Sequence, residues 1–362
     1  YNQMVYGLQV TTVADPRRIA SVLPEVRPTI WGGVPRIFEK LMAGLLAAIE
    51  ADPDGSRRNA IRRALEVATE RVRLRDVGEP IPDELEHLHR ELDARVLSKL
   101  RERIGLDQAE WIICGAAPLE RHVHEFLLAL GLPIVELYGM SECTCVVTVC
   151  RPEDARIGTV GKAIPGVELR VEADGELRVR GSIVMRGYRE DPQRTAEALD
   201  ADGWLRTGDI AEIDSDGHVR IVDRKKELII NAAGKNMSPA NIEAQLKSSS
   251  PLIGQAICIG DGRPYNVALL VLDPDAAVAY AAKHDIDGDL ASLATHEVLT
   301  RDVGAAVRRA NERLSRVEQI KTFRILPDEW LPGGEELTPT MKLKRKPILA
   351  KYSAAIAELY SD

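Results

Sequence analysis

The chain has 362 residues, of which 45% are hydrophobic and 29% charged, and it carries a formal net charge of −8 at pH 7. This length allows two domains with a sizeable core, and the acidic balance argues against a nucleic-acid partner. Five cysteines in a chain of this length fit a reducing compartment better than a disulfide framework. The sequence shows neither a secretory signal pattern nor an apolar run long enough to span a bilayer, so we expect a cytoplasmic protein.

The first 104 residues are predicted to be mainly helical. Residues 28–36 read as a buried strand that enters a helix at a proline, and apolar spacing predicts helices over 36–50, 56–77 and 82–104. The second of these helices contains seven arginines, which are Arg57, Arg58, Arg62, Arg63, Arg71, Arg73 and Arg75. A basic helix can lie on an anionic membrane, and the same pattern is also typical of a solvated face. Because the chain begins at Tyr1 without an initiator methionine, we interpret it as part of a longer protein.

Two apolar stretches in the next part of the chain end in residues that suit a nucleotide. Residues 110–114 predict a strand that leads into the small residues Gly115, Ala116, Ala117 and Pro118, which would let a backbone approach a flat ring closely. Residues 133–137 predict a second strand, which leads into Tyr138, Gly139, Met140, Ser141 and Glu142. A tyrosine ring can stack on adenine, and a carboxylate at a strand exit can bind Mg²⁺.

Short pairs of metal-ligand residues occur near these stretches. Cys143 and Cys145 lack the second pair or the histidine that would complete a tetrahedral metal site, so we expect buried structural thiols. His122 and His124 are interpreted as solvent-exposed or core residues in the same way.

Residues 203–239 predict a rigid hairpin followed by a joint between domains. The hairpin has Asp216-Gly217 as its turn, and it contains the segment Thr207-Gly208-Asp209. The charged run 223–226 follows, and then a new apolar segment ends at Gly234. Such a change of character indicates that one domain ends here and another begins.

The remaining residues predict a compact α+β domain with a basic tail. Strands are expected over 253–258 and 267–271, and helices near 275–283, 290–296 and 301–314. The tail over 336–346 contains Lys342 within a run of lysines, and a basic segment of this kind could bind phosphate as point charges.

These motifs, in this order, resemble the adenylate-forming enzymes, which comprise acyl-CoA synthetases, luciferases and peptide-synthetase adenylation domains. The resemblance is greatest to bacterial long-chain fatty acid–CoA ligases, and it covers nearly the whole chain. It implies an α/β large domain with mixed sheets, helices and a small β-barrel-like part, truncated at its N-terminus, over residues 1–225. Residues 36–104 would be a helical insertion in that domain, and residues 226–362 a small mobile α+β C-terminal domain.

The resemblance also implies roles for the residues that carry the motifs. Gly115, Ala116, Ala117 and Pro118 would form the adenine-side loop, in which the preceding Cys114 departs from the usual small residue. Tyr138 would stack on adenine next to Gly139 and Met140, Ser141 would face the phosphate and the substrate carboxyl group, and Glu142 would bind Mg²⁺. Ser141 stands where threonine is commoner, but it keeps the hydroxyl group.

In the second part of the chain the resemblance assigns ribose binding, a hinge and a catalytic cation. Asp209 and Arg224 would hold the ribose of ATP, Lys226 would be the hinge, and Gly234 would lie near the pantetheine arm of CoA. Lys342 would stabilise charge as the fatty acid carboxylate attacks the α-phosphate.

The implied function is that of a long-chain fatty acid–CoA ligase, which converts ATP, a fatty acid and CoA into acyl-CoA, AMP and pyrophosphate through an acyl-adenylate. The family's Ser/Thr/Gly-rich phosphate loop ending in lysine does not occur in these 362 residues, so we expect this polypeptide alone to be inactive or severely impaired. A fatty acyl-AMP ligase that serves a carrier protein is a close alternative, and a noncatalytic nucleotide-binding module is a more distant one. An oligomer and contact with the inner face of a membrane both stay open.

Overall fold

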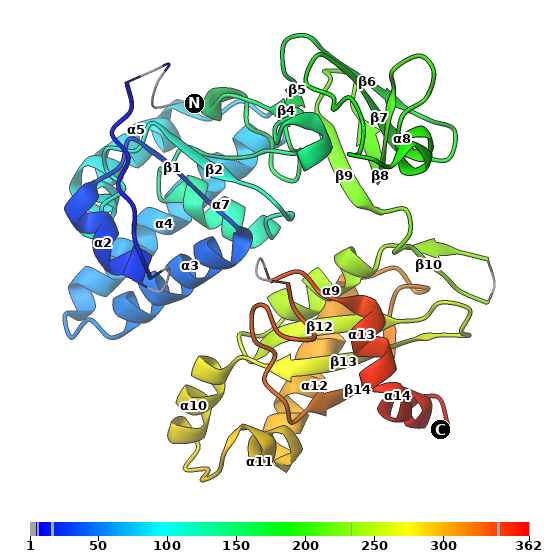
Figure 1. Cartoon of the computed structure of the whole chain (residues 1–362). Coiled ribbons are helices and arrows are strands. Elements are labelled where there is room, and N and C mark those ends of the chain that lie inside the picture. Colours follow the sequence, from blue (N-terminus) through cyan, green and yellow to red (C-terminus); the bar gives the residue numbers. More distant parts are fainter. Residues whose placement is uncertain (1–4, 6, 16–17, 233, 339–340, 362) are drawn as a thin grey trace. The chain divides into compact units, whose positions relative to one another are not determined.

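The computed structural model describes residues 5, 7–15, 18–232, 234–338 and 341–361 (Figure 1). Its contacts divide the chain into two compact units. The first unit contains Tyr1–Glu168, Gly181–Arg186 and Ile213–Arg220, and the second contains Leu169–Arg180, Gly187–Glu212 and Ile221–Asp362. The domain boundary at 225/226 and the helical insertion stay predictions.

The first unit is built on a small parallel sheet with helices packed against it. The sheet has the order β1-β2-β3, with β1 at Ile30–Gly33, β2 at Trp111–Cys114 and β3 at Ile134–Glu136. The helices are α2 (Ile19–Val26), α3 (Pro35–Glu50), α4 (Gly55–Asp76), α5 (Asp83–Leu92), α6 (Ser98–Ile104) and α7 (Arg121–Ala129). The short strands β4 (Thr148–Val149) and β5 (Lys162–Ala163) form a separate pair.

Local sequence explains where these helices begin and end. Pro35 starts α3, and the Asp54 side chain caps α4 by accepting from the backbone N–H groups of Ser56 and Arg57. Gly105 ends α6 with φ 72°, and a Cβ atom there would lie 2.2 Å from the backbone oxygen of Leu23. The helices predicted over 36–50 and 56–77 are confirmed. The one predicted over 82–104 is confirmed as α5 and α6, which a π-helical turn (Asp93–Leu97) joins without a break.

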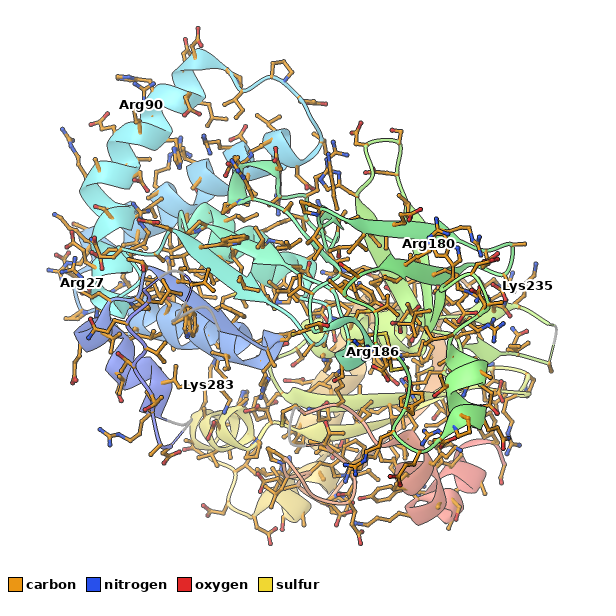
Figure 2. The ribbon with its side chains drawn as sticks, turned by 45° about the horizontal axis from the view of Figure 1, so that its top comes forward. Arg27, Arg90, Arg180, Arg186, Lys235 and Lys283 are labelled. Atoms are coloured by element: carbon orange, nitrogen blue, oxygen red, sulfur yellow. The ribbon has the colours of Figure 1, made fainter. Side chains whose placement is uncertain are left out.

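The arginines of α4 are mostly paired with carboxylates. Five of the seven form such pairs, which are Arg57–Asp52, Arg62–Glu50, Arg63–Glu66, Arg71–Glu86 and Arg73–Glu125. The opposite side of α4 is buried in the core, so the helix is not a free amphipathic element. This pairing favours the solvated-face interpretation. Figure 2 shows Arg27 and Arg90 on the outside of the same unit, where both are exposed.

Within the described part of the chain, no helix combines the length and the apolar character needed to cross a bilayer.

Most of a four-stranded sheet belongs to the second unit. Its order is β6-β7-β8-β9, with β6 at Val167–Val171, β7 at Glu176–Gly181, β8 at Leu205–Ile213 and β9 at Val219–Arg224. The predicted Asp216-Gly217 turn is confirmed, since Gly217 has φ 86°. A second Asp-Gly turn, Asp174-Gly175, has φ 81° at Gly175. A short helix, α8 (Pro192–Ala198), precedes β8, and the pair β10 (Ile229–Ile230) and β11 (Asn236–Met237) follows β9.

The C-terminal part of the second unit is a three-stranded sheet covered by helices on both faces (Figure 1). The strands are β12 (Ile253–Ile259), β13 (Asn266–Leu272) and β14 (Ile320–Leu326), and β13 is central and fully buried. The helices are α9 (Pro239–Ser248), α10 (Pro274–Lys283), α11 (Leu290–Thr295), α12 (Glu297–Arg313), α13 (Arg345–Lys351) and α14 (Ser353–Leu359). The predicted elements of this part are confirmed, whereas β14, α13 and α14 were not predicted.

The cysteines require a correction. Cys143 is buried as expected, but Cys145, for which burial was also predicted, is exposed. Of the other cysteines, Cys114 and Cys258 are buried and Cys150 is partly exposed. Cys145 has φ 83° in the turn after Ser141–Cys143, and this turn directs the residue away from the core. Burial raises the pKa of Cys143 and of Cys150 to about 11, and it also raises the pKa of Cys114 and of Cys258.

These differences predict the order of thiol alkylation. The thiolate is the nucleophile, and a raised pKa keeps a thiol protonated at pH 8. With iodoacetamide at pH 8, we therefore expect Cys145 to react first, and Cys114 and Cys258 to react only after unfolding. Peptide mapping by mass spectrometry measures this order. Alkylation of Cys258 in the folded protein as fast as Cys145 would contradict it.

Candidate functional site

The parallel sheet of the first unit brings two of the predicted segments to one edge. Because β2 and β3 are parallel, the residues that follow them leave the sheet on the same side, where open α/β sheets bind their ligands. The Gly115 N–H donates to the oxygen of Gly33 at 3.2 Å, and the Leu137 N–H donates to the oxygen of Cys114 at 2.9 Å. The loop after Cys114 and the loop after Leu137 therefore begin side by side.

The loop Gly115–Pro118 is exposed from Ala116 to Pro118 and is held at its far end by a buried carboxylate. Ala116 adopts φ 73°, an unusual conformation for a residue with a Cβ atom. The Leu119 N–H that follows the loop donates to Glu136 Oε2 at 2.9 Å. Glu136 is only 4% exposed, and its other oxygen lies 3.5 Å from Nδ1 of the buried His124. His124 thus lies in the core, and Glu136 is a supporting residue that the sequence analysis missed.

The segment Tyr138–Glu142 makes a tight turn that requires glycine at its second position. A Cβ atom on Gly139 would lie 1.8 Å from the backbone oxygen of Cys145, so no other residue fits without a shift of the backbone. The Tyr138 backbone pairs with Thr148, and the Met140 oxygen accepts from the N–H groups of Cys143 and Cys145.

This turn leaves the two polar side chains of the segment near the surface. Ser141 is exposed and Glu142 is half-buried, and the Glu142 backbone oxygen is held by the Met185 N–H at 2.7 Å. A carboxylate and a hydroxyl group at one sheet edge are hard oxygen donors of the kind that Mg²⁺ and phosphate groups meet in proteins.

In the second unit, the structure brings Asp209 and Arg224 into direct contact. Arg224 Nε lies 2.8 Å from Asp209 Oδ1, on the neighbouring strands β8 and β9. Asp209 is 3% exposed, whereas the Arg224 side chain is 50% exposed. The Asp209 N–H donates to Thr207 Oγ1, which in turn donates to the oxygen of Leu177 at 2.7 Å. The carboxylate is therefore fixed in place beside an accessible guanidinium group.

A second network, which the sequence analysis missed, braces the glycine between Thr207 and Asp209. The Gly208 N–H donates to Glu176 Oε1 at 3.0 Å, and the Gly208 oxygen accepts from the Lys225 N–H at 2.8 Å. Lys225 Nζ lies 3.1 Å from Glu176 Oε2 and 2.6 Å from Asp174 Oδ2. The hydrogen bonds to Asp174 and Glu176 raise the pKa of Lys225. The hydrogen bond from Lys225 lowers the pKa of Asp174.

The residues predicted for the hinge and for CoA contact lie in turns. Lys226 is exposed in a turn closed by the N–H groups of Glu227 and Leu228, which donate to the oxygen of Arg224. Gly234 has φ 74°, and a Cβ atom added to it would meet no atom within 4 Å. The positive φ is thus sufficient reason for glycine at this turn.

Lys342 lies in a short loop that closes on itself. Leu337 pairs with Leu343, the Thr338 N–H donates to the Lys342 oxygen at 2.8 Å, and the Lys342 N–H donates to Thr338 Oγ1 at 2.9 Å. The Lys342 side chain is exposed. Pro339 and Thr340 of the predicted motif lie outside the described residues.

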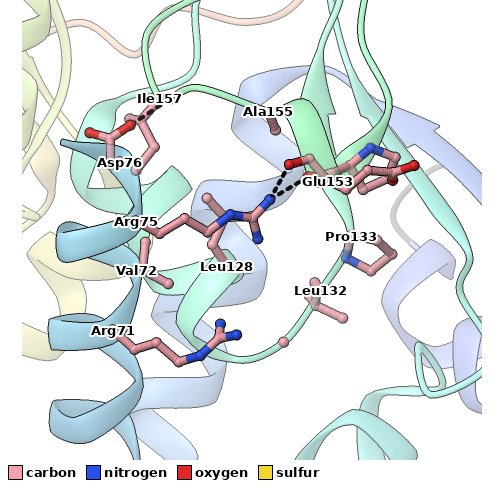
Figure 3. Close-up of a pocket in the computed structure, with 12 residues that line it drawn as sticks. Arg71, Val72, Arg75, Asp76, Leu128, Leu132, Pro133, Glu153, Ala155 and Ile157 are labelled. Carbon is pink, nitrogen blue, oxygen red and sulfur yellow. Dashed lines mark hydrogen bonds between the residues drawn. The ribbon is translucent and has the colours of Figure 1, made fainter. Parts of the chain in front are cut away.

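A pocket of the first unit lies away from the predicted site residues (Figure 3). It is bounded by α4, by the end of α7 and by Pro133 at the amino end of β3, which is the opposite end from the loops described above. Arg75 reaches across it and donates to the backbone oxygens of Pro152 and Glu153 at 3.1 and 2.6 Å. The pocket contains none of the predicted site residues.

Comparison with solved structures identifies the class of fold. The adenylation domain of a carboxylate reductase from Mycobacterium chelonae superposes with a TM-score of 0.69 at 20% identity, covering 97% of this chain and 50% of that domain's chain. The chain therefore has the adenylate-forming enzyme fold, with a mixed α/β large domain and a C-terminal domain, as the resemblance implied.

Comparison with families and curated proteins identifies the family. The family model described as AMP-binding enzyme matches residues 3–189, and the one described as AMP-binding enzyme C-terminal domain matches residues 226–362. The chain belongs to the AMP-binding enzyme family.

Two relatives from Mycobacterium tuberculosis illustrate the similarity. A putative fatty-acid–CoA ligase, FadD11, is 52% identical over 362 residues, which is 100% of this chain and 63% of the relative. A long-chain-fatty-acid–CoA ligase, FadD15, is 37% identical over 350 residues, which is 96% of this chain and 57% of the relative. The chain thus spans about three fifths of the length of these relatives.

Proposed function

We propose that this chain belongs to a long-chain fatty acid–CoA ligase, which forms an acyl-adenylate from ATP and a fatty acid and then transfers the acyl group to CoA. The observation that carries the proposal is the 52% identity, over all 362 residues, to a relative named a fatty-acid–CoA ligase. The site geometry supports it, because the hydrogen-bonding groups that the reaction needs occur at the motif positions in both units.

In this proposal the first unit holds the base and the phosphate side of the nucleotide. Tyr138 and the loop Gly115–Pro118 would contact adenine, with Gly139 and Met140 next to the nucleotide in the turn that follows Tyr138. Ser141 would face the phosphate and the carboxyl group that is activated. Glu142 would hold Mg²⁺, which neutralises phosphate charge when bound. Among the described residues, no group of three or more His, Cys, Asp or Glu side chains could hold a metal.

The second unit supplies the remaining parts of the proposed mechanism. The Asp209 carboxylate would accept hydrogen bonds from the ribose hydroxyl groups, with Arg224 beside it. Lys342 would stabilise the charge that develops while the fatty acid oxygen attacks the α-phosphorus and pyrophosphate leaves. The turn at Lys226 would act as the hinge, and the Gly234 turn would lie along CoA during acyl transfer.

Exchange between ATP and labelled pyrophosphate tests the first half-reaction. It is measured with the active ligase, by which we mean the longer protein to which this chain is proposed to belong. We expect exchange that requires hexadecanoate and does not require CoA, because acyl-adenylate formation is reversible before CoA enters. Release of ADP and phosphate without exchange would contradict the proposal. If the acyl group is transferred to a phosphopantetheinyl carrier protein and not to CoA, the proposed acceptor is wrong, whereas the proposed acyl-adenylate intermediate stands.

A further inference from the structure

A buried ion pair lies at the base of the loop that carries Lys342. Arg345 begins α13, three residues after Lys342, and its side chain is only 17% exposed. Its Nη2 lies 2.7 Å from Glu243 Oε2, and its Nε lies 3.3 Å from Glu227 Oε2. The guanidinium group thus bridges α9 and the turn that contains Lys226 and Glu227.

Glu243 is itself bonded to the three-stranded sheet of β12, β13 and β14. It lies on α9 and is 6% exposed, and its Oε1 accepts the Cys258 N–H of β12 at 2.7 Å. One carboxylate oxygen therefore bonds to the sheet and the other bonds to Arg345. Burial raises the pKa of Glu243, and Arg345 opposes this increase. The pair thus joins the tail to α9 and, through Glu243, to strand β12.

The segment between Lys342 and Arg345 is short, and Lys344 bonds it to the preceding residues of the tail. The Lys344 N–H donates to the oxygen of Glu336 at 2.7 Å, and Lys344 Nζ donates to the oxygen of Gly334 at 2.8 Å. Three residues span at most roughly 10 Å, so the position of Arg345 limits where Lys342 can go.

We infer that Arg345 is a positioning residue for Lys342, and that it acts by anchoring the Lys342 loop to Glu243. This inference rests on the role proposed for Lys342. A buried ion pair often contributes little net stability compared with apolar residues of the same size. Positioning of the Lys342 loop explains the presence of this ion pair better than a gain in stability does. The planar fork of arginine holds two carboxylates in a fixed geometry, which a lysine cannot do.

Hydrogen exchange of individual amides tests the inference on the chain itself. The variants are Arg345→Met, Arg345→Lys and the matched control Lys346→Met, which replaces the exposed neighbouring cation. In Arg345→Met we expect the amides of Lys342 and Lys344 to exchange roughly tenfold faster, with the amides of β13 unchanged, because only the loop loses its anchor. Arg345→Lys should give an intermediate effect, and the control should give none.

Two results would overturn the inference. One is unchanged exchange at Lys342 and Lys344 in both Arg345 variants. The other is an equal acceleration in β13, which would mean that Arg345 supports the fold as a whole. If Arg345→Met does not fold, Arg345→Lys is used instead, because it keeps the charge but lacks the planar fork. Exchange at Lys342, Lys344 and β13 in that variant then tests the inference in the same way.

A second readout separates this inference from the proposed function. In the active ligase, Arg345→Met should slow acyl-adenylate formation but leave the transfer of a preformed acyl-adenylate to CoA within about twofold of the wild-type rate. If Lys342→Ala itself leaves acyl-adenylate formation unchanged, the role of Lys342 is wrong. If Lys342→Ala slows it and Arg345→Met does not, only the anchoring role is wrong.

Discussion

Replacing Lys342 by alanine is expected to slow acyl-adenylate formation by about 10²–10³, the usual cost of removing one preorganised electrostatic stabiliser. The transfer of a preformed acyl-adenylate to CoA should stay near the wild-type rate, because Lys342 is assigned only to the first half-reaction. Single-turnover assays of the two half-reactions in the active ligase measure both effects.

Because Lys342 is exposed, its replacement should affect catalysis without disturbing the fold. Its side chain is exposed, so the free energy of unfolding should change by no more than about 0.5 kcal/mol. Lys346→Ala, which removes an exposed cation from the same tail, is the matched control and should leave both half-reactions unchanged. Equal losses in the two variants would show that the tail acts only through its overall charge.

The second large effect is expected from Asp209→Ala, which should weaken AMP binding roughly 100-fold. A charge-assisted hydrogen bond contributes about 1.5–3 kcal/mol, and the buried carboxylate would accept bonds from the ribose. Removal of the carboxylate also leaves Arg224 without its partner at 2.8 Å. Isothermal titration calorimetry of AMP with the chain measures the affinity.

Two further variants separate binding from folding. Asp209→Asn keeps the shape of the side chain. It should therefore reduce the affinity for AMP but change the midpoint of thermal unfolding less than Asp209→Ala does. Asp202→Ala removes an exposed carboxylate from the turn before β8 and should leave the affinity unchanged. If Asp209→Ala binds AMP as well as the wild type, the ribose assignment is wrong.

The motif positions could be predicted from the sequence, but most of the reasons for them could not. Gly139 belongs to a recognisable motif, yet only the structure shows that its Cβ atom would meet the oxygen of Cys145. Asp209 and Arg224 lie 15 positions apart, and their ion pair depends on the pairing of β8 with β9.

The features that the sequence analysis missed depend on contacts between distant segments. Glu176 braces Gly208 across 32 positions, and no local pattern connects the two residues. Strand β14 pairs with β13 in parallel after a long helical connection, so its partner is not its neighbour in sequence. The exposure of Cys145 follows from a positive φ that cysteine rarely adopts.

The proposed function depends most on the claim that the chain recognises an acyl-adenylate and not a nucleotide alone. Hexadecanoyl-sulfamoyladenosine, a hydrolysis-resistant analogue of the acyl-adenylate, can be titrated calorimetrically into the chain beside AMP. We predict that it binds roughly 100-fold or more tightly than AMP, because the acyl chain adds buried apolar area. Equal affinities for the two compounds would contradict the claim and would indicate a module that binds only nucleotide.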